Sequence, residues 1–301
     1  MTTIGFIGLG HMGFPMVKNL LKNNYVVKVY DLNTAAISSL IAVGATAATS
    51  PAEIANNADV VLTMLQTGDQ VKQSCLGEQG IFAQLKKTAL YIDCSSIDIQ
   101  SSRELHAAAK ANHIAMCDAP VSGGVIAAQN ATLTFMVGGD ENNFTRAQPI
   151  LNAMGKKIIY AGLAGNGVAA KICNNMILGI SMIAVSEAFV LADKLGLAPE
   201  KLFEISSNAS GQCWSLTNYC PWPNILPNVP SSHGYQPGFS AKMMLKDLRL
   251  SQEAATTAQA ETPLGKRAMQ IYDQFIDNYP GEIDFSGIIQ MLAHCKMGKI
   301  E

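Results

Sequence analysis

Two hydrophobic patterns divide the chain. Up to about residue 162, short apolar runs alternate with segments whose apolar positions recur every three or four residues. Continuous apolar runs are typical of strands in a parallel sheet covered on both faces, so the alternation predicts an α/β domain. Beyond residue 162 the period is helical throughout. We therefore predict an α/β domain over residues 1–162, a long interdomain helix over 163–195 and an all-helical domain over 196–301.

The predicted long helix carries the first candidate chemistry. It follows a glycine-rich segment, 162–167, and from 176 to 191 it is apolar on nearly every side, which predicts burial. Lys171 and Asn175 lie four residues apart and so project from the same face. A lysine and an amide beside a glycine hinge suit an active site between two domains. The alternative is a buried helix whose lysine side chain extends to solvent.

A cofactor motif stands at the start of the chain. A strand-like run leads into a Gly-x-Gly-x-x-Gly motif made of Gly8, Leu9, Gly10, His11, Met12 and Gly13. At a strand-to-helix junction, such glycines allow a tight turn and close approach of a dinucleotide pyrophosphate. Asp31 ends the next strand, about twenty positions on, where a carboxylate accepts hydrogen bonds from the adenosine ribose and repels a 2′-phosphate. The motif predicts a Rossmann-like domain that binds NAD rather than NADP; a structural turn with a surface aspartate is the alternative.

Further candidates for ligand binding stand at the ends of the later strands of this domain. Leu65 and Gln66 end one predicted strand, and Ser95 and Ser96 end another. Loops at the carboxyl ends of such strands face the ligand in open α/β sheets, so these positions are candidates for the cofactor side. A further strand runs into Ser122, Gly123 and Gly124, whose backbone N–H groups and hydroxyl would bind a carboxylate. The alternative for this last segment is an ordinary turn.

The helical part contains one long segment without a helical pattern. Helices are predicted over 199–208, 241–259 and 264–278. Between the first two, residues 214–239 are rich in aromatics and proline, and loops this long are usually functional or interfacial. Lys246 and Asp247 lie on the next helix, where an internal ion pair or a solvated face is the alternative to a functional role.

Composition limits the classes of partner. The chain has 301 residues, 49% of them apolar and 15% charged, with a formal net charge of −2. This charge gives no electrostatic basis for binding nucleic acid or an acidic membrane, and polar residues interrupt the most apolar window, which argues against a membrane span. The seven cysteines form no CxxC pair and no zinc-ligand spacing, so we expect no metal and reduced thiols in a cytoplasmic protein. The first residues of the sequence form a strand pattern and lack the charged or arginine-rich features of an export or organelle signal, which adds to the expectation of a cytoplasmic protein.

Taken together, the motifs resemble those of the β-hydroxyacid dehydrogenase family along essentially the whole chain. The glycine motif is similar to the family's cofactor signature, and segment 118–124, Asp-Ala-Pro-Val-Ser-Gly-Gly, is similar to its substrate-binding motif. Residues 165–175 resemble its catalytic motif, and Phe239 with 246–248 its C-terminal cofactor-side motif. Segment 213–248 looks more like that of 3-hydroxyisobutyrate dehydrogenases than that of tartronate semialdehyde reductases. A subgroup with the same look oxidises L-serine.

The resemblance implies a role for each candidate residue. Lys171 is the acid–base group for the substrate hydroxyl, and Asn175 fixes its geometry. Ser96 and Lys246 orient the nicotinamide, and Ser122 to Gly124 bind the carboxylate of a small hydroxyacid. The remaining substrate-side candidates are Trp214, Tyr219, Phe239 and Asp247. Family members are usually dimers or tetramers, so a homodimer or homotetramer is expected.

The resulting hypothesis is NAD-dependent oxidation of 3-hydroxyisobutyrate to methylmalonate semialdehyde, a step of valine catabolism. Oxidation of L-serine, or of another 3-hydroxyacid as in tartronate semialdehyde reductases, is the alternative. A non-catalytic NAD-binding protein is a rival from another class, but the lysine and the asparagine argue against it. A metal-dependent alcohol dehydrogenase is a weaker rival, because the chain has no His/Cys cluster to hold zinc.

Overall fold

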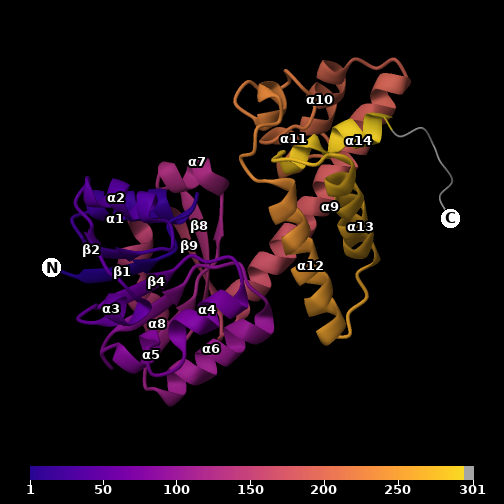
Figure 1. Cartoon of the computed structure of the whole chain (residues 1–301). Coiled ribbons are helices and arrows are strands. Elements are labelled where there is room, and N and C mark those ends of the chain that lie inside the picture. The colour runs from indigo at the N-terminus through magenta and orange to yellow at the C-terminus, as the bar shows by residue number, and fades with distance from the viewer. Residues whose placement is uncertain (295–301) are drawn as a thin grey trace. The chain divides into compact units, whose positions relative to one another are not determined.

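The computed structural model describes residues 1–294, so the predicted thiol of Cys295 lies outside the described part. The chain divides into two compact units, Met1–Lys171 and Ile172–Glu301, and the division falls within a long helix, α9 (Asn166–Lys194). The first unit is built on a mainly parallel sheet and the second on helices (Figure 1). The predicted fold class is confirmed. The boundaries predicted at residues 162 and 195 stay a prediction.

Among the described residues, nine strands form one sheet in the N-terminal unit. The strands are β1 (Thr3–Ile7), β2 (Val26–Tyr30), β3 (Thr46–Ala47), β4 (Val60–Thr63), β5 (Leu90–Asp93), β6 (Ala115–Asp118), β7 (Val121–Ser122), β8 (Leu133–Gly139) and β9 (Gly155–Gly162). Their order is β3-β2-β1-β4-β5-β6-β8-β7, with β9 also pairing with β8. The pairs from β3 through β6 are parallel, and β8 is antiparallel to β6 and β7. The strand order reverses between β1 and β4, which is where open α/β sheets bind ligands.

The helices of this unit are α1 (Gly13–Lys22), α2 (Thr34–Ile41), α3 (Pro51–Ala55), α4 (Gly68–Cys75), α5 (Ile81–Gln84), α6 (Ile99–Ala111), α7 (Gly124–Gln129) and α8 (Glu141–Asn152). Figure 1 shows α1 and α2 on one side of the sheet and α3 and α5 on the other. Side-chain acceptors start several of them: Asn33 caps α2, Ser50 caps α3 and Asp98 caps α6. The central strands β4 and β5 are fully buried between these layers, as their apolar runs predict.

The C-terminal unit packs helices around two apolar clusters. Beyond α9 its elements are α10 (Pro199–Ser207), α11 (Trp214–Thr217), the 3₁₀ helix η1 (Pro230–His233), α12 (Ala241–Thr257), α13 (Pro263–Asn278), the 3₁₀ helix η2 (Phe285–Gly287) and α14 (Ile288–His294). One cluster joins α9, α12 and α13 through Met182, Met244 and Tyr272. The other joins α9 to segment 214–239 through Phe189, Leu216 and Tyr235. The aromatic segment is therefore packed and contains two short helical turns.

Helix α9 is apolar all round but buried on only one face. Its buried positions follow a seven-residue repeat that includes Ile172, Asn175, Met182 and Phe189. By length and composition α9 also passes the test for a membrane span, but 44% of its apolar window is buried, and core helices pass the same test. Packing of Met182 and Phe189 into the two clusters makes α9 a core helix of the folded unit.

The opposite face of α9 differs from the prediction of full burial. Ile177 is 65% exposed and Leu191 60% exposed. The apolar pattern predicts that both faces are covered, whereas the single chain covers only the face that packs on α12, α13 and segment 214–239.

Candidate active site

The glycine loop between β1 and α1 has the geometry that a dinucleotide requires. Gly8 has φ +97°, and a Cβ at this position would collide with the carbonyl of Met64. A Cβ at Gly13 would collide with the carbonyl of Gly8, so helix α1 packs directly on the turn. Nothing lies within 4 Å of the Cβ position at Gly10, which leaves the backbone open. Gly8 therefore allows the turn, Gly10 leaves the backbone accessible and Gly13 allows the helix to pack closely, in the order that the motif predicts.

Asp31 connects this loop to the end of β2. Its carboxylate accepts hydrogen bonds from the backbone N–H groups of Leu9 (2.5 Å) and Asn33 (2.7 Å). Each carboxylate oxygen has a further lone pair, so the group can still accept from ribose hydroxyls. A hollow of about 470 Å³ lies beside the loop, with Gly10, His11 and Asn33 in its lining. The free N–H groups at the start of α1 add a partial positive charge suited to phosphate.

The loops after β4 and β5 are joined by polar contacts that the sequence does not reveal. Leu65 donates its backbone N–H to the Ser95 hydroxyl (2.8 Å), and Ser95 donates its own N–H to Asp93 (3.1 Å). Thr63 donates its hydroxyl to the same carboxylate oxygen of Asp93 (2.8 Å). Burial raises the pKa of Asp93 to about 6, despite these donors. The network joins the predicted cofactor-side position Leu65 to the loop that contains Ser96, whereas the adjacent Gln66 donates its backbone N–H to Gln70 (3.0 Å).

The predicted carboxylate cradle lies where β7 meets α7. Ser122 ends β7 and is paired with Thr134 of β8, and Gly124 begins α7. Gly123 has φ +127° and Gly124 has φ +68°, so both adopt backbone conformations that other residues rarely take. The two glycines therefore form the turn that joins β7 to α7, and anion binding by the N–H groups of 122–124 stays a prediction.

The predicted catalytic pair lies on α9. Lys171 is half-buried, and Asn175 is 1% exposed. Within the C-terminal unit, Asn175 donates its amide N–H to the buried carboxylate of Asp247 on α12 (2.5 Å). The Asn174 side-chain amide donates to the side-chain oxygen Oδ1 of Asn175 (2.9 Å). Asp247 therefore orients Asn175, and its burial excludes the solvated face that was one alternative for this residue.

The aromatic candidates are held together by a residue that the sequence does not single out. Trp214 stacks on Tyr219 with ring centroids 5.1 Å apart, and Phe239 packs edge-on against Phe285. The buried carboxylate of Asp284 accepts hydrogen bonds from the Tyr219 hydroxyl (3.0 Å) and from the backbone of Phe239 (3.0 Å). Burial raises the pKa values of both Asp284 and Tyr219. The Tyr219 hydroxyl is thus engaged, and what this segment offers a ligand is chiefly ring surface.

Asp118 is a further buried aspartate whose structural function the sequence does not show. It stands in the motif 118–124, yet its spacing to its partners gives no sign of their contact. Its carboxylate accepts hydrogen bonds from the backbone of Gly165 and Val168 and contacts His106. It therefore lies at the start of α9, the helix of Lys171.

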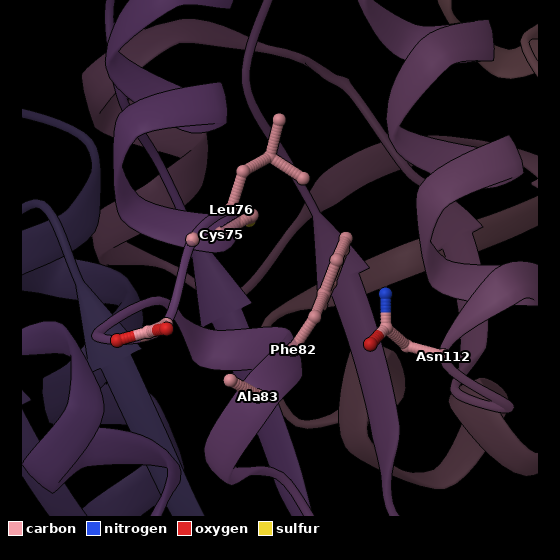
Figure 2. Close-up of a pocket in the computed structure, with 7 residues that line it drawn as sticks. Cys75, Leu76, Phe82, Ala83 and Asn112 are labelled. Carbon is pink, nitrogen blue, oxygen red and sulfur yellow. The ribbon is translucent and has the colours of Figure 1, made fainter.

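A second hollow of the N-terminal unit lies apart from these residues. It measures about 350 Å³, and Figure 2 shows Leu76, Phe82 and Asn112 around it. Its lining comes from the ends of α4 and α6 and from α5, and includes none of the predicted site residues. Within residues 1–294, no group of three or more His, Cys, Asp or Glu side chains could hold a metal ion.

Comparisons with known proteins agree with this geometry. Residues 3–162 match the domain family described as the NAD-binding domain of 6-phosphogluconate dehydrogenase. Residues 165–292 match the family described as NAD-binding of NADP-dependent 3-hydroxyisobutyrate dehydrogenase. The chain therefore belongs to the NAD-dependent 3-hydroxyacid dehydrogenase family, as its motifs predict. Its cofactor is NAD, and it is an oxidoreductase.

Two relatives with different substrates in their names are equally similar to the chain. The probable 3-hydroxyisobutyrate dehydrogenase of Mycobacterium tuberculosis is 44% identical over 292 residues, 97% of this chain and 98% of the relative. The NAD-dependent L-serine dehydrogenase of Pseudomonas aeruginosa is 44% identical over 299 residues, 99% and 100%. A solved structure of the M. tuberculosis 3-hydroxyisobutyrate dehydrogenase with L-serine has a TM-score of 0.92, and the match covers 97% of this chain and 99% of that one.

Proposed function

We propose that the chain oxidises 3-hydroxyisobutyrate to methylmalonate semialdehyde with NAD. Bound NAD supplies the acceptor for the hydride that leaves the hydroxyl-bearing carbon. The glycine loop and Asp31 hold the cofactor, and Leu65, Gln66, Ser96 and Lys246 border its nicotinamide end. The residues fit a dinucleotide because Gly10 leaves the loop backbone open and Asp31 keeps lone pairs for a ribose.

Proton transfer is assigned to Lys171. In oxidation, its neutral amine would take the proton from the substrate hydroxyl oxygen as the carbon that bears this hydroxyl gives up a hydride to the nicotinamide, and in reduction it would return that proton. Asn175 holds the hydroxyl or the lysine in place, because its amide is itself fixed by Asp247 and Asn174. Ser122, Gly123 and Gly124 bind the substrate carboxylate through backbone N–H groups and the serine hydroxyl.

The choice of substrate rests chiefly on one observation: the chain from 214 to 239 contains aromatic rings but no aspartate or glutamate. 3-Hydroxyisobutyrate, L-serine and D-glycerate differ in a methyl, an ammonium and a hydroxyl group on the middle carbon. A methyl group needs an apolar wall, whereas a buried ammonium needs an acceptor and is costly without one. The two acidic candidates outside the segment are both engaged: Asp247 accepts a hydrogen bond from Asn175, and Asp284 accepts from the Tyr219 hydroxyl and from the backbone of Phe239. The segment therefore favours the methyl substrate.

L-Serine is the second candidate substrate. It is favoured by the equal identity of the chain to a relative named L-serine dehydrogenase. In this alternative Asp247 would accept from the ammonium group through its remaining lone pairs, and the rings of Trp214 or Tyr219 would add a cation–π contact.

Steady-state kinetics on a panel of 3-hydroxyacids tests the choice. We expect kcat/KM to rank 3-hydroxyisobutyrate above L-serine, and both above D-glycerate. Selection by a single methyl group is worth only about 1–3 kcal/mol, so the margin is modest. A clear preference for L-serine would refute the ranking. Asp247→Asn should then depress the rate on serine more than the rate on 3-hydroxyisobutyrate, with Glu253→Gln, an exposed change on the same helix, as the control.

We also propose that the chain is a cytoplasmic homodimer or homotetramer. The exposed apolar face of α9, with Ile177 and Leu191, supports assembly because monomeric proteins rarely expose a continuous apolar patch. The described cysteines are free thiols, as suits a reducing compartment. Sedimentation equilibrium should give a mass of two or four chains. A monomer at micromolar concentration would contradict the assembly.

A further inference from the structure

The start of α9 lacks a capping side chain of its own. Gly165 occupies the capping position before Asn166, and its carbonyl accepts the first helical bond, from Ala169 (2.9 Å). The first N–H groups of any helix have no partner within it, and a Ser, Thr, Asp or Asn at the capping position usually supplies one. A glycine has no side chain to do so.

Asp118, at the end of β6, supplies the missing acceptor from a distant part of the sequence. One carboxylate oxygen accepts from the Gly165 N–H (2.9 Å) and the other from the Val168 N–H (2.9 Å). The carboxylate is fully buried. Its negative charge lies at the positive end of the helix dipole, where it is stabilising. One side chain thus satisfies both backbone groups that a local cap would serve.

Glycines make room for this carboxylate. A Cβ at Gly138 would lie 2.6 Å from one Asp118 side-chain oxygen, and a Cβ at Gly167 would lie 2.8 Å from the other. Neither position can hold a larger residue without moving the aspartate. The Gly165-Asn166-Gly167 segment is therefore a closely packed junction, whereas the sequence alone predicts a flexible hinge.

Helix α6 closes over the junction. His106 contacts the Asp118 oxygen that accepts from Gly165, through its Nε2 atom (2.8 Å), and the His106 side chain is 11% exposed. Arg103, one turn earlier, lies over Gly165, where a Cβ would be 3.1 Å from the arginine Cγ. With Gly165 and His106 on one oxygen and Val168 on the other, both oxygens of the buried carboxylate have hydrogen-bond partners. A buried charge requires such partners.

We propose that Asp118 is a positioning residue for Lys171 and that His106 fixes Asp118 in turn. Lys171 comes three residues after Val168, so the backbone that Asp118 holds is the turn that precedes the lysine. Anchoring this turn restricts where the lysine amine can lie when a substrate binds. The inference rests on the proposed role of Lys171 as the proton-transfer group. Small displacements of such a group lower the rate of the chemical step without weakening cofactor binding.

Asp118→Asn tests the proposal. The asparagine has a single acceptor oxygen, so its NH₂ group must face the N–H of either Gly165 or Val168. We expect kcat to fall by at least roughly tenfold, since a misplaced catalytic group commonly costs that much or more. The dissociation constant of NADH should stay within about a factor of two. Amide hydrogen exchange across 163–170 should become faster.

Asp140→Asn is the matched control, because Asp140 also caps a helix of the same unit, accepting the Asn142 N–H at the start of α8 (2.9 Å). It should leave kcat and exchange across 163–170 unchanged. An Asp118→Asn enzyme with faster exchange but wild-type kcat would overturn the positioning role. If wild type turns over no 3-hydroxyacid, the proposed function fails, and the exchange data still report whether Asp118 holds the helix.

Substitutions of His106 provide a milder series should Asp118→Asn fail to fold. His106→Ala removes the contact to the carboxylate, and His106→Gln restores an N–H donor. We expect kcat to fall severalfold in the alanine variant and to recover in the glutamine variant, with NADH binding unchanged in both. Wild-type kcat in His106→Ala would overturn the role of the histidine. If, in addition, Asp118→Asn does not fold, the positioning role is refuted and Asp118 is a structural residue only.

Discussion

The two units of the chain build their parts of the site differently. In the N-terminal unit, the candidate groups before α9 lie in loops at strand ends, and much of the chemistry proposed for them belongs to backbone N–H groups near Gly10, Gly123 and Gly124. In the C-terminal unit, the candidates are side chains. Their positions depend on buried polar bonds between distant residues, such as Asn175 with Asp247 and Tyr219 with Asp284.

The difference has a physical cause. A turn that brings backbone N–H groups to a phosphate requires glycine at fixed spacing, so the requirement is visible in a few consecutive residues. A side chain on a helix needs only the right face, and many sequences provide that. What makes it function is a partner that tertiary packing brings near. The comparison can be tested by removing one group at a time from each kind of region.

The largest effect on activity is expected at Lys171, the last residue of the N-terminal unit. Lys171→Ala should reduce turnover about 10²- to 10⁴-fold, the range for loss of a positioned acid–base group. NADH binding and the midpoint of unfolding should be unchanged. Lys194→Ala, an exposed change at the far end of the same helix, is the control for stopped-flow and equilibrium measurements. Turnover within a few-fold of wild type would remove Lys171 from the mechanism.

Asp284→Ala should cause the next largest change, in stability. The side chain accepts hydrogen bonds from the Tyr219 hydroxyl, the backbone of Gly238 and Phe239, and the hydroxyl and N–H of Ser286. Leaving several buried donors unpaired should lower the free energy of unfolding by about 3–5 kcal/mol. Urea denaturation measures the loss, and Asp277→Ala on the exposed face of α13 is the control. A loss below about 1 kcal/mol would contradict the organising role of Asp284.

How far the sequence predicts the structure follows the same division. The alternation of strands and helices, the limits of β2 and the glycine loop are predictable. Each is specified by a local hydrophobic period or by the spacing of a few consecutive residues. Asp118 and Asp284 are not predictable as organising residues, because Gly165, a partner of Asp118, lies 47 positions away and Tyr219, a partner of Asp284, lies 65 positions away. The exposed face of α9 also escapes prediction, since an apolar pattern does not distinguish cover by the same chain from cover by another.

The hydrogen-bond network around Asp93, which joins the loops after β4 and β5, should affect how the free energy of unfolding depends on pH. The pKa of Asp93 is raised from 3.8 to about 6, because burial disfavours its charged form. Well above pH 6 the carboxylate is ionised in both the folded and the unfolded protein. Burying its charge then lowers the free energy of unfolding by the full amount. As the pH falls from about 6 to 4, the folded protein takes up the proton first and gains stability.

The expected gain follows from the difference of about two pKa units, or roughly 3 kcal/mol at about 1.36 kcal/mol each. The measurement is the free energy of unfolding of wild type minus that of Asp93→Asn, from pH 7 to pH 4. Groups common to both proteins, such as Asp59 with its lowered pKa, cancel in this difference. A difference that stays flat or decreases toward pH 4 would show that Asp93 keeps an ordinary pKa.

The smallest effect is expected at Asp31, which tests the region that the sequence predicts best. Its carboxylate holds the N–H groups of Leu9 and Asn33 and is proposed to accept from the adenosine ribose. Asp31→Asn keeps one acceptor oxygen but removes the charge, and hydrogen bonds to charged groups contribute about 1.5–3 kcal/mol. We expect kcat/KM for NAD to fall roughly tenfold while the value for NADP falls less or rises, because a 2′-phosphate is no longer repelled. The control is Asp69→Asn, which removes an equally charged but exposed side chain of the same unit. An unchanged NAD-to-NADP ratio in Asp31→Asn would place cofactor choice elsewhere, and the glycine loop would then predict dinucleotide binding without predicting which dinucleotide binds.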